Sequence, residues 1–116
     1  MKNKVAKNSK IEVQVGLGAD GIPEKITWVA PGNPNGPGQQ ECKAMMLSVF
    51  DKEAKDTLKI DLWTKEMQVA EMDRFVYQTL RALADTYQRA TQNTALANDM
   101  QRFALYFGEQ TEIVPK

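Results

Sequence analysis

Residues 57–91, TLKIDLWTKEMQVAEMDRFVYQTLRALADTYQRAT, decide the fold. In the first seven of these residues, apolar and polar side chains alternate, which is the two-residue period of a strand with one buried face. From Val69 onward, apolar residues recur every three or four positions and the opposite stripe is polar. The two periods predict a strand over 57–63 followed by an amphipathic helix of about six turns, ending near Thr91.

Three more strands are predicted on the N-terminal side of this segment. Apolar residues alternate over 11–17, the pair Asp20-Gly21 suits a tight turn, and a second alternating run covers 25–30. Residues 45–50 are apolar on both faces and pair with 57–63 across the charged loop 51–56. We therefore expect two β-hairpins.

A second helix is predicted on the C-terminal side. Asn93 or Thr94 can cap its start, and Gly108 is a candidate for its end. Its apolar stripe consists of Leu96, Met100, Phe103 and Phe107. Strands followed by helices predict an α+β fold, namely a four-stranded antiparallel sheet with two antiparallel helices packed on one face. We expect a flexible tail over 1–9 and a single domain over 10–113, with an exposed loop rich in Pro and Gly at 31–40.

Composition limits the possible partners. The 15 Lys and Arg residues balance the 15 Asp and Glu residues, whereas a nucleic-acid binder normally has a basic surplus. No apolar run is long enough for membrane insertion. Cys42 is the only cysteine, which is typical of a reducing compartment, so we expect a cytoplasmic protein.

The chain contains no histidine, the commonest general acid/base and metal ligand near neutral pH. Ser-His-Asp and Cys-His catalysis are therefore excluded, as is any zinc site that uses imidazole. Paired carboxylates stay open as a route to glycoside chemistry, although a chain this short has little from which to build a cleft. We predict no enzymatic activity, no catalytic residue, no metal and no cofactor.

Two short motifs have ordinary explanations. The run from Gly16 to Gly21 matches G-x-G-x-x-G, but a strand follows it instead of the helix that a dinucleotide site requires, so we expect a hairpin. The acids Asp51, Glu53 and Asp56 lack the glycine and glutamate spacing of a calcium loop, so we expect a solvated loop.

The junction between the predicted strand and helix is the candidate protein-binding site. Tryptophan and methionine contribute strongly to protein interfaces, although both also pack in cores, and the sequence leaves both roles open here. The predicted binding residues are Trp63, Thr64, Lys65 and Met67.

Four runs of sequence resemble one known family. They are IPEKITW, KAMMLSVFD, TLKIDLWTKEM and EMDRFVYQTLRALADTYQRAT, and they are similar in order to the GldC gliding-motility proteins over about residues 11–107. The loop around 31–38 departs from the family in composition. The resemblance implies an accessory protein of the gliding and secretion apparatus that has no known enzymatic activity and binds other proteins of that machinery.

A second likeness is one of layout only. Four strands followed by two helices are also found in the SecB export chaperones, which suggests a chaperone-like binder of exported proteins as an alternative. We also expect a homo-oligomer, because a sheet covered by helices on one side leaves a face and its edges to be covered. The apolar segment 44–50 offers surface for such contacts.

Overall fold

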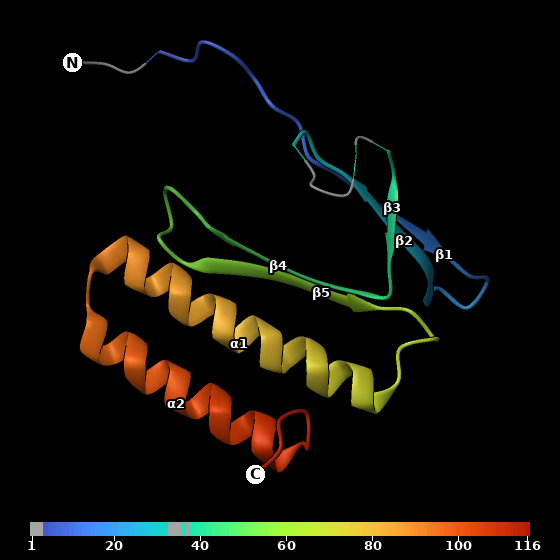
Figure 1. Cartoon of the computed structure of the whole chain (residues 1–116). Helices are drawn as coiled ribbons and strands as arrows, with labels where there is room; N and C mark the ends of the chain where they lie inside the picture. The colour runs from blue at the N-terminus through green and yellow to red at the C-terminus, as the bar shows by residue number, and fades with distance from the viewer. Residues whose placement is uncertain (1–3, 33–35, 37) are drawn as a thin grey trace. The chain divides into compact units, whose positions relative to one another are not determined.

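The computed structural model describes residues 4–32, 36 and 38–116, so residues 33–35 and 37 of the predicted loop lie outside it, as do residues 1–3 of the predicted tail. The chain forms two compact units, Met1–Met67 and Gln68–Lys116. All strands belong to the first unit and both helices to the second (Figure 1). The α+β class predicted from the sequence is confirmed.

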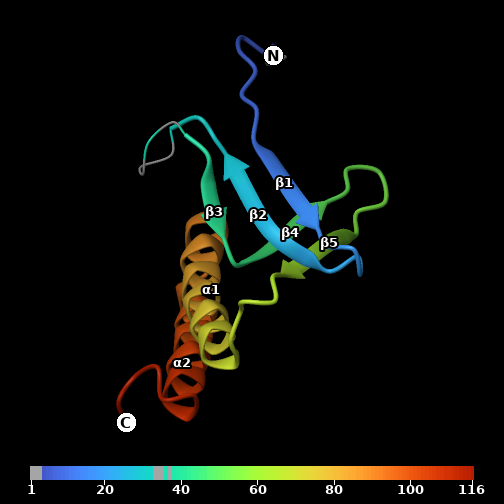
Figure 2. The same cartoon turned by 90° about the vertical axis from the view of Figure 1, so that its right-hand side faces the viewer.

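The first sheet has the order β1-β2-β3. Its strands are β1 (Glu12–Leu17), β2 (Pro23–Val29) and β3 (Gln40–Cys42), and each neighbouring pair is antiparallel (Figure 2). Between β1 and β2, Gly21 has a φ of 78°, and the Ile22 amide donates to Asp20 Oδ1 at 3.0 Å. The G-x-G-x-x-G run therefore forms a hairpin, as predicted.

The second sheet contains β4 (Ala44–Phe50) and β5 (Thr57–Trp63) in full antiparallel register. In this register, the odd-numbered residues of β4 lie opposite the even-numbered residues of β5 on one face of the hairpin, and every residue on that face is apolar. That face consists of Met45, Leu47, Val49, Leu58, Ile60 and Leu62. The other face is mixed and carries Lys59, Asp61 and the aromatic residues Phe50 and Trp63.

The prediction of one four-stranded sheet is wrong. The described residues form sheets of three and two strands, because residues 40–42, which include the end of the predicted loop, pair with β2 as β3. The backbone bends at Lys43 before β4 begins, so β4 and β5 do not continue the sheet formed by β1, β2 and β3. The pairing of Cys42 with Ile26 thus occupies the edge of β2 that a single sheet would have used.

The helical unit is a hairpin of α1 (Val69–Thr91) and α2 (Thr94–Gln110), which lie side by side (Figure 1). Near the connecting turn, Gln88 Nε2 donates to Thr94 Oγ1 at 3.0 Å. Further along, Gln101 Nε2 donates to Asp85 Oδ1 at 3.1 Å. Between these two contacts, the residue on α1 moves back along the chain while the residue on α2 moves forward. This is possible only if the helices are antiparallel, as predicted.

The residues buried in this helical unit are small. Ala84 on α1 and Ala97, Ala104 and Gly108 on α2 are buried. By contrast, Leu96 and Phe103 of the predicted apolar stripe are exposed. Gly108 does not end α2, which continues to Gln110. Within the described chain, neither helix combines the length and the apolar character of a membrane span.

Candidate protein-binding site

Trp63 is the last residue of β5 and lies opposite Ala44. Its side chain is 55% exposed, which leaves a large part of the indole free for contact with another molecule. An indole this exposed on a short strand end is suited to serve as an interface anchor. Of the four predicted binding residues, Trp63 and Lys65 are exposed, Met67 is partly exposed and Thr64 is buried. Their role in binding stays a prediction.

Thr64 and Met67 have a different role in the same junction. Thr64 is buried, and its amide donates to the Lys43 carbonyl oxygen at 2.8 Å, which extends the β4–β5 ladder by one pair. The Met67 amide donates to the Thr64 carbonyl oxygen at 3.1 Å and closes a turn. Thr64 Oγ1 is buried without a hydrogen-bond partner in the structure. These two residues shape the backbone beneath Trp63.

Lys65 bridges to the turn between β1 and β2. Its Nζ lies 2.7 Å from Asp20 Oδ2 and 2.9 Å from Glu24 Oε1, and all three side chains remain partly exposed. The hydrogen bond from Lys65, helped by the Ile22 amide, lowers the pKa of Asp20, and the hydrogen bonds to Asp20 and then Glu24 raise the pKa of Lys65. Sequence reasoning missed both acids, which lie more than 40 residues away along the chain; the only signal was the acidic residues around the Asp20-Gly21 turn.

The β4–β5 hairpin exposes more apolar surface than its sequence pattern predicts. No residue of either strand is buried, although on each strand every second residue is apolar, as in a strand with one face in a core. The large apolar side chains that are exposed on the apolar face are Leu47, Val49, Leu58 and Ile60, whereas Phe50 and Trp63 are exposed on the other face, at opposite ends of the hairpin. An apolar patch like the one on the apolar face is typical of an interaction surface.

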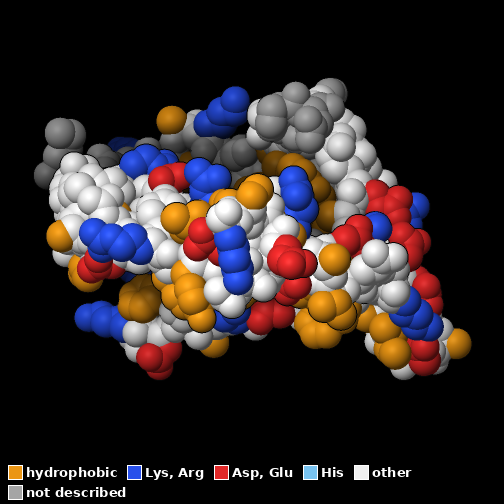
Figure 3. Space-filling view, turned by 60° about the horizontal axis from the view of Figure 1, so that its bottom comes forward, with side chains coloured by type: hydrophobic (Ala, Val, Ile, Leu, Met, Phe, Trp, Pro, Cys, Tyr) orange, Lys and Arg blue, Asp and Glu red, His pale blue; other side chains and the backbone are white. Residues whose placement is uncertain are grey.

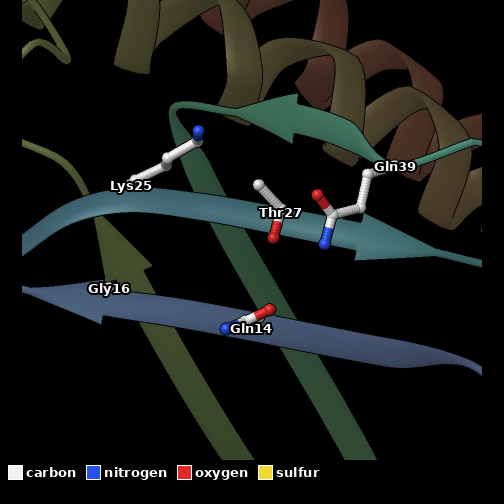
Figure 4. A pocket seen from close by; sticks show the side chains of 5 residues that line it. All are labelled: Gln14, Gly16, Lys25, Thr27 and Gln39. Atoms are coloured by element: carbon white, nitrogen blue, oxygen red, sulfur yellow. The ribbon is translucent and has the colours of Figure 1, made fainter.

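A small hollow of about 230 Å³ lies over the β1–β2 ladder. It is lined by Gln14 and Gly16 of β1, Lys25 and Thr27 of β2, and Gln39 just before β3 (Figure 4). The described lining residues carry two amides, one hydroxyl and one ammonium group. These groups can donate and accept hydrogen bonds.

Other chemistry-bearing groups are scattered. Among the described residues, no three Cys, Asp or Glu side chains gather closely enough to hold a metal ion. Burial, followed by the charge of Glu41, raises the pKa of the Cys42 thiol, which disfavours the reactive thiolate. On the face shown in Figure 3, Lys and Arg side chains are interspersed with Asp and Glu, so this view shows no continuous basic surface.

The comparisons with known proteins give one match. The family model described as "Gliding motility-associated protein GldC-like" matches residues 23–113, which covers β2 to the end of α2 and leaves β1 outside. Neither the search of curated proteins nor that of solved structures returned a match. The family match covers most of the 116 residues and confirms the resemblance found in the sequence. The chain therefore belongs to the GldC-like family of gliding motility-associated proteins.

Proposed function

We propose that the chain is a non-enzymatic accessory protein of the gliding-motility and secretion apparatus, and that it acts by binding another protein of that machinery. Membership of the GldC-like family supports the assignment to gliding motility. The observation that carries the binding mechanism is the exposure of Trp63 at the end of a hairpin whose apolar side chains are also exposed. Aromatic anchors of this kind supply much of the free energy of protein association.

The balance of charge supports a protein partner over a polyanion. Equal numbers of basic and acidic residues give no long-range attraction to nucleic acid or to an anionic membrane surface. The absence of histidine from the sequence supports the proposal that the chain performs no acid–base catalysis.

A pull-down from the native organism, made with wild-type protein and with Trp63→Ala, tests the proposal. Loss of an anchoring indole weakens binding by about 2 kcal/mol, or about thirtyfold, so the variant should recover much less of one partner. Phe50→Ala is the matched control, because Phe50 is 69% exposed on the same hairpin face at the opposite end. Recovery of the same partners in equal amounts by a folded Trp63→Ala protein would contradict the role of the junction.

The exposed apolar face of β4–β5 also favours a second candidate, a chaperone-like binder of exported proteins. Extended apolar segments of unfolded clients could contact Leu47, Val49 and Leu58. The discriminating measurement is selectivity: a chaperone binds many unrelated unfolded proteins with similar affinity, whereas a dedicated accessory protein recovers one folded partner. Titration with a reduced, unfolded test protein measures this directly.

A further inference from the structure

The outer edge of β5 is a template for one more strand. In the part of the chain that the structure describes, the sheet that contains β5 has only β4 as its other member. Backbone N–H and C=O groups on an unpaired edge favour pairing with another chain. β5 runs for seven residues and none of them is buried, so this edge is long enough to accept a partner strand.

Two hydrogen bonds show which residues of β5 direct their backbone N–H and C=O groups toward that outer edge. The Asp51 amide donates to the Asp56 carbonyl oxygen at 2.9 Å at one end of the hairpin, and the Thr64 amide donates to the Lys43 carbonyl oxygen at 2.8 Å at the other. Hydrogen-bonded and non-bonded pairs alternate along an antiparallel ladder. The even-numbered residues of β5 therefore direct their backbone groups toward β4, and the odd-numbered residues, Lys59 and Asp61 among them, direct theirs outward.

The charges on this edge are self-complementary. Lys59 and Asp61 lie on the same face, one on each side of Ile60, which is the middle residue of Thr57–Trp63. Their Nζ and Oδ2 atoms are 3.2 Å apart, and both side chains are well exposed. If two copies of β5 pair antiparallel about Ile60, each Lys59 lies opposite Asp61 of the other copy.

We propose that the chain forms a two-fold symmetric homodimer by antiparallel pairing of β5 with β5 of a second copy, in a register fixed by Lys59 and Asp61. This register uses the full length of the strand and lets the outward backbone groups of Lys59 bond those of Asp61. It also sets Leu58 beside Leu62 of the second copy, which joins the two apolar faces into one sheet of four strands. The proposal is independent of the proposed function.

Neighbouring registers are disfavoured by the same two charges. Pairing centred on Lys59 brings two lysines face to face, and pairing centred on Asp61 does the same for two aspartates, which destabilises both arrangements. A lone lysine on an edge strand commonly prevents pairing. Here Asp61 lies two residues away, so the two opposite charges favour one register instead of preventing pairing. The outer edge of β4 has no charged residue between Ala44 and Phe50 that could select a register in this way.

Charge-reversal variants test this dimer by sedimentation velocity over a range of concentrations. Pairing of single strands makes a small interface, so we expect wild-type protein to pass from 13.1 kDa to twice that mass at about 1–500 µM. Lys59→Asp and Asp61→Lys each place like charges opposite one another and should weaken the dimer at least about tenfold. Lys52→Asp is the matched control, because it makes the same charge change in the exposed 51–56 loop, away from the paired edge, and should leave the dimer intact.

Complementation separates this register from any other interface. An equimolar mixture of Lys59→Asp with Asp61→Lys restores both opposite-charge pairs, as does the doubly exchanged protein Lys59→Asp/Asp61→Lys, so both samples should dimerise again. In addition, the amide hydrogens of Lys59 and Asp61 should exchange more slowly at high protein concentration, whereas that of Ile60, already bonded to β4, should not change. A wild-type monomer at about 500 µM, dimers that persist in both single variants, or folded variants that fail to complement would each overturn the proposal.

Discussion

The ring of Tyr77 on α1 lies so close to Gly108 on α2 that a β-carbon on Gly108 would come within 2.7 Å of Tyr77 Cε1. The same β-carbon would lie 2.9 Å from Val114 Cγ2, in the segment that folds back after α2. The Val114 amide donates to the Gly108 carbonyl oxygen at 3.0 Å and holds that segment in place. A hydrogen atom at position 108 is therefore a requirement of the helical hairpin.

Gly108→Ala should lower the free energy of unfolding by about 1–3 kcal/mol, because the added methyl group displaces the Tyr77 ring. The sign is informative, since Gly→Ala inside an unobstructed helix raises stability by up to about 1 kcal/mol. Urea unfolding followed by circular dichroism measures the change. The second substitution Tyr77→Leu, made in the Gly108→Ala background, should recover part of the loss; an unchanged or stabilised Gly108→Ala protein would refute the close contact.

Asn93→Ala should destabilise the protein by about 1 kcal/mol. Asn93 caps α2, and its side-chain oxygen accepts a hydrogen bond from the Leu96 amide at 3.1 Å. Asn98→Ala is the matched control, because Asn98 is exposed inside the same helix and its replacement should leave stability unchanged or slightly raised. Equal melting temperatures for the two variants would show that the cap contributes nothing.

Ile26→Ala should lower the free energy of unfolding by about 2–5 kcal/mol, because it leaves a cavity in the first sheet. Ile26, in β2, is 0% exposed and pairs with Val15 and Cys42 on its two sides. Ile11→Ala makes the same change at a side chain that is 72% exposed and should alter stability by less than about 0.5 kcal/mol. Thermal melts of both proteins give the comparison, and similar losses for the two would place Ile26 outside the core.

Lys65→Met should raise the pKa of Asp20 toward its ordinary value of 3.8, because the side-chain hydrogen bond from Lys65 is the main cause of the lowered pKa. A carboxyl group with a lowered pKa in the folded state contributes stability that is present above pH 3.8 and is lost as the pH falls through the folded pKa. The raised pKa of Lys65 acts in the opposite range: its contribution is present below pH 10.5 and is lost as the pH rises through the folded value.

Carbon-detected NMR titration of the Asp20 carboxyl group measures this shift directly. Lys52→Met serves as the control, since Lys52 lies in the exposed 51–56 loop and should leave the Asp20 titration unchanged. The Ile22 amide still donates to Asp20 in the Lys65→Met protein, so part of the lowering should persist. If Asp20 titrates identically in wild-type and Lys65→Met protein, the ion pair does not form in solution.

Most strands and both helices were predictable because their apolar residues recur regularly, at every second position in strands and at every third or fourth position in helices. The prediction for β5 matches Thr57–Trp63, and α1 ends at Thr91 as its amphipathic pattern requires. β3 was not predictable, since its three residues follow a stretch rich in Pro and Gly and are too few to show a period. The separation into two sheets follows from that short strand. Whether the helices cover a sheet face stays a prediction, as do the domain bounds.

The sequence singled out Trp63 because it is a large aromatic residue at the change from strand to helix periodicity. Trp63 is exposed in the structure, and its role in binding stays a prediction. The burial of Thr64 depends on its backbone pairing with Lys43, which sequence alone does not reveal. The contact of Lys65 with Asp20 and Glu24 joins segments that are distant along the chain. Long-range ion pairs leave no local pattern.

The use of alanine and glycine between α1 and α2 has a consequence for how relatives of this chain should vary. The residues at 84, 97, 104 and 108 are small and buried, and a β-carbon at position 108 would clash with Tyr77. Leu96 and Phe103 are about half exposed, so changes in their size should disturb the helical hairpin less than changes at the buried positions. In a set of aligned relatives, fixed small residues would therefore mark the scaffold, and correlated changes at the exposed apolar positions would trace the surfaces that evolve with a binding partner.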